Sequence, residues 1–135
     1  MLQTEIQLRV RYSETDRMGY AYYGNYAQYF EVARVEMLRS LGITYKTMED
    51  EGILLPVLEL NIKYIKPAYY DDLLTIKTKI PSLPTARIYF EYDTFNADGE
   101  LLNKATTTLV FIKSKTGRPC SVPEDLLEKM KPFYI

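Results

Sequence analysis

Tyr12–Arg34 reads YSETDRMGYAYYGNYAQYFEVAR, and the other predicted elements of the chain are arranged around this stretch. A predicted strand ends in a turn over residues 15–19, and a second turn at Gly24-Asn25 leads into a helix. Asn25 is a residue type that caps helix N-termini, and Gln28 stands three positions later, where the partner in a capping box belongs. The pattern predicts a strand, an irregular loop and a helix N-terminus in close succession.

Asp16 is the acid in the middle of this loop, and Gly19 follows it. A carboxylate near the unpaired N–H groups of a helix N-terminus can attack or deprotonate, while the helix end holds an oxyanion. An aspartate close to a glycine is also commonly used to close an Asx-turn. Spacing alone leaves both interpretations of Asp16 open. Gly19 is expected to supply a backbone conformation that other residues resist.

These residues resemble the 4-hydroxybenzoyl-CoA thioesterase family of the hotdog fold, including its Tol–Pal-associated branch. The family pattern joins an aromatic residue, Thr-Asp or Cys-Asp, a glycine, a short aromatic run, Asn-Tyr and a helix with an acid-x-Ala motif. The matching residues are Tyr12, Thr15, Asp16, Gly19, Asn25, Tyr26, Glu31, Ala33 and Arg34, and a second patch holds Leu55-Pro56-Val57, Tyr64, Pro67 and Asp71-Asp72-Leu73-Leu74. The resemblance extends from about residue 6 to residue 112.

The resemblance implies a thioesterase that acts on an acyl-CoA or an acyl carrier protein, with Asp16 as nucleophile or general base. It implies that the backbone N–H of Tyr23 polarises the thioester carbonyl at the helix N-terminus. The Tol–Pal-associated branch usually has histidine at this position, but a backbone donor survives a change of side chain. No cofactor is implied, since coenzyme A is part of the substrate. The implied assembly is a homodimer or homotetramer.

Further candidate residues accompany Asp16 and Tyr23. Those for substrate binding are Gly19, Gly24, Asn25, Tyr26, Glu31 and Arg87, and Lys113, Lys115 and Arg118 are either additional contacts for coenzyme A phosphates or solvated charges. Glu31 is a candidate substitute base, although its spacing from Arg34 favours an ordinary ion pair on the helix surface. The aromatic cluster of Tyr20, Tyr22, Tyr26 and Tyr29 lines an acyl pocket or packs in the core, and core packing is favoured.

Composition limits the class of protein. A length of 135 residues, with 47% hydrophobic and 26% charged residues, suits a single domain over residues 1–135. A formal net charge of -1 gives no basic field for nucleic acid. Cys120 is the single cysteine, which excludes an intrachain disulfide and favours a reducing compartment. Since no signal peptide or apolar run of roughly 20 residues is present, we expect a cytoplasmic protein without a membrane span.

The chain has no histidine. This excludes Ser-His-Asp and Cys-His catalysis and His-ligated metal sites, so no metal is expected. It also argues against a hotdog hydratase or dehydratase, because those enzymes place histidine beside a carboxylate. The remaining alternative is a non-catalytic hotdog module that binds acyl-CoA or a protein partner. The motif of Asp16 and Gly19 with Asn25-Tyr26 argues against that alternative without removing it.

Apolar periodicity predicts the remaining elements. Alternation predicts strands over residues 3–11, 58–64, 74–80, 88–95 and 101–113, while helical spacing predicts a long helix over 26–41, a short one from Thr44 to Gly52 and a C-terminal one after Pro123. One long helix fills a two-layer domain if a sheet curls around it. We therefore expect an α+β hotdog fold, an antiparallel sheet wrapped around a long central helix. Apolar strand residues on both faces, among them Tyr89, Phe95, Leu109 and Phe111, predict a partner subunit.

Overall fold

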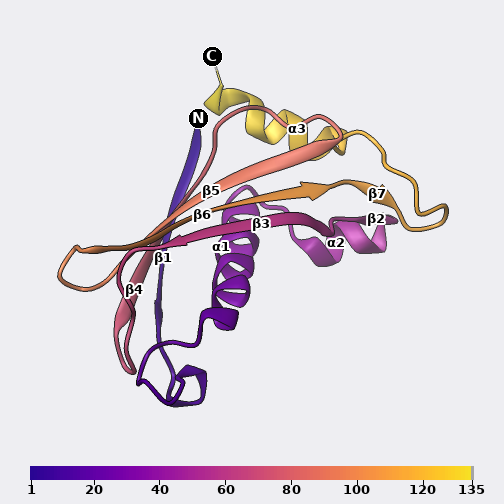
Figure 1. Ribbon diagram of the computed structural model, residues 1–135. Helices are drawn as coiled ribbons and strands as arrows, with labels where there is room; N and C mark the ends of the chain where they lie inside the picture. Colours follow the sequence, from indigo (N-terminus) through magenta and orange to yellow (C-terminus); the bar gives the residue numbers. More distant parts are fainter. Residues whose placement is uncertain (135) are drawn as a thin grey trace.

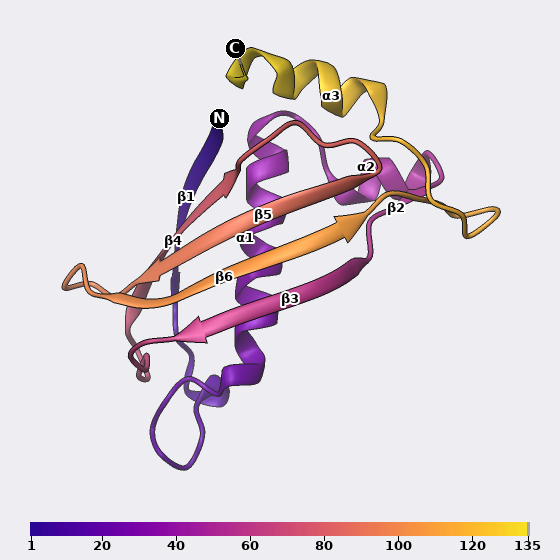
Figure 2. The ribbon, with the colours of Figure 1, turned by 45° about the horizontal axis from the view of Figure 1, so that its top comes forward.

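The computed structural model describes residues 1–134. A long helix, α1 (Tyr26–Ser40), lies inside the curve of an antiparallel sheet (Figure 1). The sheet has five strands in the order β1-β4-β5-β6-β3, with bounds β1 Leu2–Arg9, β4 Leu73–Ile80, β5 Arg87–Phe95, β6 Leu101–Val110 and β3 Val57–Tyr64. Figure 2 shows β3, β5 and β6 crossing over α1. The predicted sheet around a central helix is confirmed.

The core lies between α1 and the concave face of the sheet. The α1 residues that face the sheet are buried, including Phe30, Ala33, Met37 and Leu38, as the helical spacing of apolar residues predicts. The ring of Phe30 stacks on that of Tyr92 in the central strand β5, with 4.5 Å between ring centroids. Buried residues of β4 and β5, mostly apolar, alternate with less buried ones and fill the rest of this face. Burial of this stripe fixes α1, and hence the position of its N-terminus.

Short elements close the ends of the sheet. These are α2 (Tyr45–Asp50), β2 (Ile53–Leu54), β7 (Ile112–Lys113), α3 (Glu124–Met130) and three 3-10 turns at Tyr12–Glu14, Tyr23–Asn25 and Lys131–Phe133. Thr44 caps α2 as predicted, since its hydroxyl oxygen accepts a hydrogen bond of 3.1 Å from the N–H of Thr47. The helix α3 lies near both chain termini in Figure 1, and its Leu126 and Met130 are buried.

Two predictions about the strands need correction. The strand expected over residues 101–113 is divided, because the chain leaves the main sheet at Phe111 and continues as β7, which pairs with β2. Leu109 and Phe111 are fully buried, so they do not make the outer face apolar. Phe95 lies on the outer face, but the ammonium group of Lys77 covers its ring at 5.1 Å.

The apolar surface lies instead along one edge. β3 ends the strand order and pairs only with β6 among the described strands. Along it, Val57, Leu58 and Leu60 are 49%, 53% and 38% exposed. An exposed strand with unpaired backbone groups is a template for pairing with another strand. No helix among residues 1–134 is long and apolar enough to cross a membrane.

Candidate active site

The loop after β1 folds back on itself around Asp16. The N–H of Asp16 donates to the carbonyl of Tyr20 at 2.8 Å, and the N–H of Gly19 donates to the carbonyl of Asp16 at 3.0 Å. Gly19 has a φ of 83°, so this tight turn requires the conformational freedom of glycine, as the sequence predicts. Asp16 therefore lies in a tight turn that backbone hydrogen bonds within the loop hold in place.

The geometry of the Asp16 carboxylate is compatible with both roles considered from the sequence, the closure of an Asx-turn and catalysis. Its Oδ1 atom accepts hydrogen bonds from the N–H groups of Met18 at 2.9 Å and Tyr20 at 3.2 Å. This is the Asx-turn arrangement. Among residues 1–134, the second oxygen, Oδ2, accepts no hydrogen bond. One oxygen therefore fixes the side chain and the other remains available for chemistry.

Glu14 joins this loop to the start of α1. Its backbone carbonyl accepts hydrogen bonds from the N–H of Tyr22 at 2.7 Å and from the side-chain amide of Asn25 at 2.6 Å. Its carboxylate accepts two more, from the N–H of Arg11 at 2.8 Å and from the hydroxyl of Tyr29 at 2.9 Å. Four hydrogen bonds from separate parts of the motif thus converge on one residue, two positions before Asp16.

The predicted capping role of Asn25 is wrong. Asn25 has helical backbone angles, φ −75° and ψ −19°, because a 3-10 turn over Tyr23–Asn25 precedes α1. Its side chain does not cap the helix and forms no capping box with Gln28; it reaches back to Glu14 instead. The Asn25 side chain therefore holds the loop against the helix.

The 3-10 turn leaves free donors at the helix end. Its first backbone hydrogen bond runs from the N–H of Asn25 to the carbonyl of Tyr22 at 2.9 Å. The N–H groups of Tyr23 and Gly24 precede it and have no backbone acceptor among residues 1–134. Gly24 allows the backbone to pass close to the Tyr22 side chain, since a Cβ at this position would lie 2.5 Å from the Tyr22 ring. The side chain of Tyr23 itself is exposed.

Asp16 and Tyr23 line the same cavity, which has a volume of about 260 Å³. Its walls are mostly apolar and aromatic, and they include Tyr20, Tyr26 and Tyr64. The rings of Tyr26 and Tyr64 make an edge-to-face contact with 5.8 Å between centroids. Burial is the main cause that raises the pKa of Tyr26 to about 12, so this phenol is neutral at ordinary pH.

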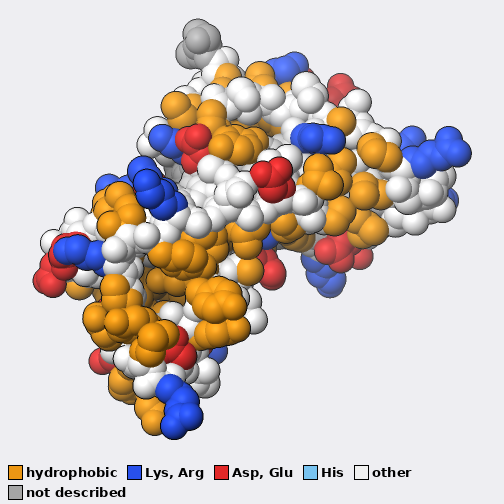
Figure 3. Space-filling model, in the orientation of Figure 1, with side chains coloured by type: hydrophobic (Ala, Val, Ile, Leu, Met, Phe, Trp, Pro, Cys, Tyr) orange, Lys and Arg blue, Asp and Glu red, His pale blue; other side chains and the backbone are white. Residues whose placement is uncertain are grey.

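The predicted aromatic cluster divides between the pocket and the core. Tyr20 and Tyr26 line the cavity, Tyr29 is buried beside Tyr26, and Tyr22 packs on Tyr23. Figure 3 shows hydrophobic side chains gathered over the lower lobe, where the loop after β1 lies in Figure 1. The exposed aromatic side chains here include Tyr12, Tyr23, Tyr64, Tyr69 and Tyr70. This lobe therefore exposes an apolar, aromatic surface.

The expected ion pair of Glu31 with Arg34 is wrong. Arg34 is buried and turned toward the sheet, where its Nη1 donates to the Tyr92 hydroxyl at 3.2 Å and its Nε to the Tyr45 hydroxyl at 3.3 Å. Glu31 remains exposed on α1 and does not line the cavity. Arg34 thus reaches the sheet and the first residue of α2, so the buried stripe of α1 is wider than the apolar residues alone indicate.

The predicted cationic contacts lie elsewhere in this chain. Arg87 is exposed at the start of β5, and Lys113 and Arg118 border a separate depression near β2. Figure 1 shows the loop after β7 far from the loop that carries Asp16. The structure therefore does not bring these cations to the Asp16 cavity within one chain.

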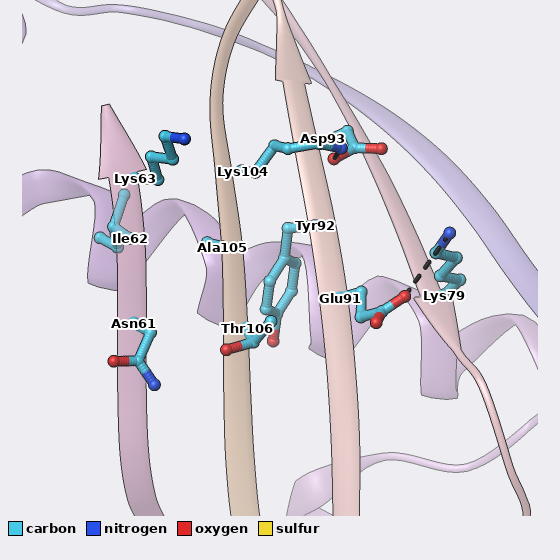
Figure 4. A pocket seen from close by; sticks show the side chains of 10 residues that line it. All are labelled: Asn61, Ile62, Lys63, Lys79, Glu91, Tyr92, Asp93, Lys104, Ala105 and Thr106. Atoms are coloured by element: carbon cyan, nitrogen blue, oxygen red, sulfur yellow. Dashed lines mark hydrogen bonds and ion pairs between the residues drawn. The ribbon is translucent and has the colours of Figure 1, made fainter. Parts of the chain in front are cut away.

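A larger depression on the outer face of the sheet carries paired charges. Figure 4 shows the Lys79 side chain pointing to Glu91, an ion pair of 3.5 Å, and Asp93 beside Lys104, a pair of 2.8 Å. This depression has a volume of about 390 Å³ and lies on the side of the sheet away from α1. Among the described residues, no group of three or more acidic or cysteine side chains is arranged to hold a metal. The Asp16 cavity remains the candidate site.

The sequence analysis did not identify two residues that help to form the candidate site. Glu14 organises the loop, and Tyr64 supplies a wall of the cavity from the far end of β3. Tyr64 belongs to the second matching patch of the family resemblance, which was the available signal. Glu14 carries no such signal, because its four partners become neighbours only in the folded chain.

Comparisons with known proteins show which family the chain belongs to. A family model described as "Thioesterase-like superfamily" matches residues 10–130. The YneP protein of Bacillus subtilis is 35% identical over 113 residues, covering 84% of this chain and 82% of that protein. The acyl-CoA thioester hydrolase YbgC of Escherichia coli O6:H1 is 31% identical over 124 residues, covering 92% of each. The crystal structure of a DHNA-CoA thioesterase from Staphylococcus aureus superposes with a TM-score of 0.93 at 36% identity, covering 98% of this chain and 91% of that one.

Proposed function

The chain belongs to the thioesterase-like superfamily, and on this premise we propose that it hydrolyses acyl-CoA thioesters at the cavity shared by Asp16 and Tyr23. It has the hotdog fold, and the reaction converts a thioester and water into a free acid and a thiol. The observation that carries the assignment of residues is that Asp16, whose carboxylate has one free oxygen, and Tyr23, at the free end of the helix, line the same apolar cavity. The apolar walls lower the local dielectric constant, which strengthens the electrostatic interactions of the carboxylate and of the N–H groups with a substrate.

Two routes use this arrangement. In the first, an Asp16 oxygen attacks the thioester carbonyl, the thiolate leaves, and water then hydrolyses the mixed anhydride. In the second, Asp16 takes a proton from a water molecule that attacks the carbonyl directly. In both routes the carbonyl oxygen becomes negative and accepts hydrogen bonds from the N–H groups of Tyr23 and Gly24. An acyl-carrier-protein thioester would react in the same way, and the proposal requires no cofactor.

A homodimer is part of the proposal. Antiparallel pairing of β3 with β3 of a second copy would cover the exposed edge, and would set the Val57 end of one strand beside the Tyr64 end of the other. Arg87 lies at the Val57 end, since it pairs with Val110 next to the partner of Val57 in β6. Arg87 of a second copy stays in this proposal as a contact for a phosphate of coenzyme A. A cytosolic location, favoured by the single free Cys120, also remains a prediction.

A non-catalytic acyl-CoA-binding module is the competing function, and one observation favours it. The hydrogen bonds of Asp16 to Met18 and Tyr20 would be useful to the fold without any chemistry. Under that alternative the free Oδ2 has no role. The two functions make different predictions for a substitution that preserves Oδ1 and changes only the other atom.

The experiment is Asp16→Asn, assayed by thiol release from a panel of acyl-CoAs. The side-chain oxygen of asparagine preserves the turn, so the melting temperature should change little. We expect kcat to fall by about a hundredfold or more, because asparagine is neither a base nor an effective nucleophile. The matched control is Asp98→Asn in the exposed β5–β6 turn, which should retain full turnover. Wild-type turnover in Asp16→Asn would show that Asp16 does not carry the reaction.

A further inference from the structure

Lys66 is the one cation among the described residues that line the Asp16 cavity. It follows the end of β3, where its backbone N–H donates to the carbonyl of Leu102 at 3.0 Å. Two residues further on, the carbonyl of Ala68 accepts a hydrogen bond of 2.7 Å from the N–H of Ala21, which joins this segment to the loop that carries Asp16. The backbone of Lys66 is therefore fixed relative to that loop.

The ammonium group of Lys66 is held by the turn between β5 and β6. It donates a hydrogen bond to the carboxylate of Glu100, and this bond keeps the pKa of the Glu100 carboxyl below its usual range. The side-chain amide of Asn96 donates to the same carboxylate at 3.1 Å, and its oxygen accepts from the Glu100 N–H at 3.0 Å. A lysine ammonium has three N–H donors, and Glu100 is the one acceptor that Lys66 has among residues 1–134. Two donors thus remain for a group that enters from solvent.

The Lys66 side chain extends from the cavity to solvent, since it lines the cavity and is 54% exposed. A cavity of about 260 Å³ accommodates an acyl group but not coenzyme A, so the sulfur of a bound thioester lies toward the opening. Lys66 therefore offers its positive charge on the side where the thiol leaves.

Thioester hydrolysis puts negative charge on two atoms in succession. The proposed function assigns the carbonyl oxygen to the N–H groups of Tyr23 and Gly24, but it leaves the sulfur without a partner. A departing thiolate needs one, because a carboxylate is the weaker base: carboxyl and thiol groups have ordinary pKa values of about 4 and about 8.5. The adduct of a carboxylate with a thioester therefore expels the carboxylate again unless the sulfur is stabilised.

We propose that the Lys66 ammonium stabilises the thiolate as the C–S bond breaks, and that Glu100 positions the ammonium for this step. The electron pair of the bond stays on sulfur, the anion leaves beside the ammonium, and the thiolate takes its proton from water afterwards. Lysine suits this role in a chain without histidine, since a lysine ammonium is charged at neutral pH and acts here without giving up a proton. The inference rests on the proposed function, because it assumes that the thioester is hydrolysed in the Asp16 cavity.

The test compares three leaving groups on one acyl group in Lys66→Met, which keeps the length of the side chain and removes its charge. The substrates are hexanoyl-CoA, the hexanoyl thioester of N-acetylcysteamine, which reproduces only the thiol end of coenzyme A, and the hexanoyl thioester of 4-nitrothiophenol. We expect kcat/KM to fall by about tenfold or more for the first two substrates. It should stay within about twofold for the third, because the aryl ring already stabilises the thiolate.

Three further variants show whether charge and position matter as proposed. Lys66→Arg keeps the charge and should retain most of the activity toward all three substrates. Glu100→Gln leaves the ammonium present but no longer held in place, so it should lower kcat/KM for the N-acetylcysteamine thioester by less than Lys66→Met does. The matched control is Lys63→Met, which removes an exposed cation of β3 that does not line the Asp16 cavity and should change none of the rates.

An equal fall for all three thioesters in Lys66→Met, or no fall for any of them, would overturn the inference, since Lys66 would then have no specific effect on the departure of the thiol. A fall confined to hexanoyl-CoA would also overturn it, and would show that Lys66 binds the nucleotide part of coenzyme A. Failure of the proposed function is a different result, in which Asp16→Asn retains wild-type turnover of hexanoyl-CoA.

Discussion

The side-chain amide of Asn25 donates a hydrogen bond of 2.6 Å to the backbone carbonyl of Glu14. This bond joins the loop that carries Asp16 to the first turn of the central helix. The carboxylate of Glu14 reinforces the connection through the hydroxyl of Tyr29 on α1. The distance between the Asp16 carboxylate and the Tyr23 N–H is therefore set by side chains that do not line the cavity.

Loss of this bond should impair catalysis more than substrate binding. In Asn25→Ala we expect kcat to fall by about tenfold to a hundredfold with a small change in KM, because a displacement of about an ångström misaligns the reacting groups. The free energy of unfolding should fall by about 1 kcal/mol. Asn25→Asp cannot donate and should behave like Asn25→Ala. Steady-state kinetics of both variants check this, and wild-type kcat in either would contradict it.

The exposed edge of β3 predicts the oligomeric state. Light scattering at micromolar concentration should report at least twice the chain mass of 15.8 kDa. Leu60→Asp places like charges near each other across a β3–β3 pair and should shift the protein toward monomer with loss of activity. Lys77→Asp on the outer face is the matched control and should leave the mass unchanged. A wild-type protein that is monomeric and fully active would contradict the proposed β3–β3 pairing.

The lack of histidine predicts the pH profile of catalysis. No side chain here has an ordinary pKa between 5 and 8, so kcat/KM should be flat from about pH 6 to 8. The measurement uses an acyl group that does not ionise, and Cys120→Ala serves as the control for the thiol. An inflection between about pH 6 and 7.5 that survives this control would contradict the prediction. If Glu31→Gln moved that inflection and Asp16→Asn stayed active, Glu31 would be the base.

Two buried phenols predict a loss of stability in alkali. Burial is the main cause that raises the pKa of both Tyr26 and Tyr92 to about 12, from the ordinary tyrosine value of about 10 that applies in the unfolded chain. A raised pKa means that the folded state favours the neutral phenol. This contribution is complete below pH 10 and is lost as pH rises toward 12. The melting temperature should therefore fall across this interval.

Substitution of one phenol identifies its share of this effect. Tyr92→Phe should lower the melting temperature at neutral pH, since its hydroxyl bonds to Arg34 and Thr107 are removed, but should flatten the alkaline decline. Tyr89→Phe, at an exposed position on the same strand, should leave the slope unchanged. Identical slopes in the wild type and Tyr92→Phe would mean that Tyr92 ionisation does not destabilise the fold.

The sequence by itself determined the elements and their order. Alternation in residues 74–80 and helical spacing of Phe30, Ala33, Met37 and Leu38 depend on near neighbours in the chain, and these patterns predicted β4 and α1. Gly19 likewise indicated a turn that other residues resist, and it has a positive φ. The motif around Asp16 indicated the family because its residue types recur at fixed short spacings.

Only the tertiary structure decided where the polar side chains point. Arg34 was expected to meet Glu31 on the helix surface, but packing of the sheet against α1 brought it to Tyr92, a residue 58 positions away. Asn25 was expected to cap its own helix and instead bonds to Glu14, and Asn103 became a buried amide through its pairing with Tyr64 and Thr94. Local spacing cannot predict such contacts, because each polar side chain takes the partner that the packed core brings within reach, however distant that partner is in the chain.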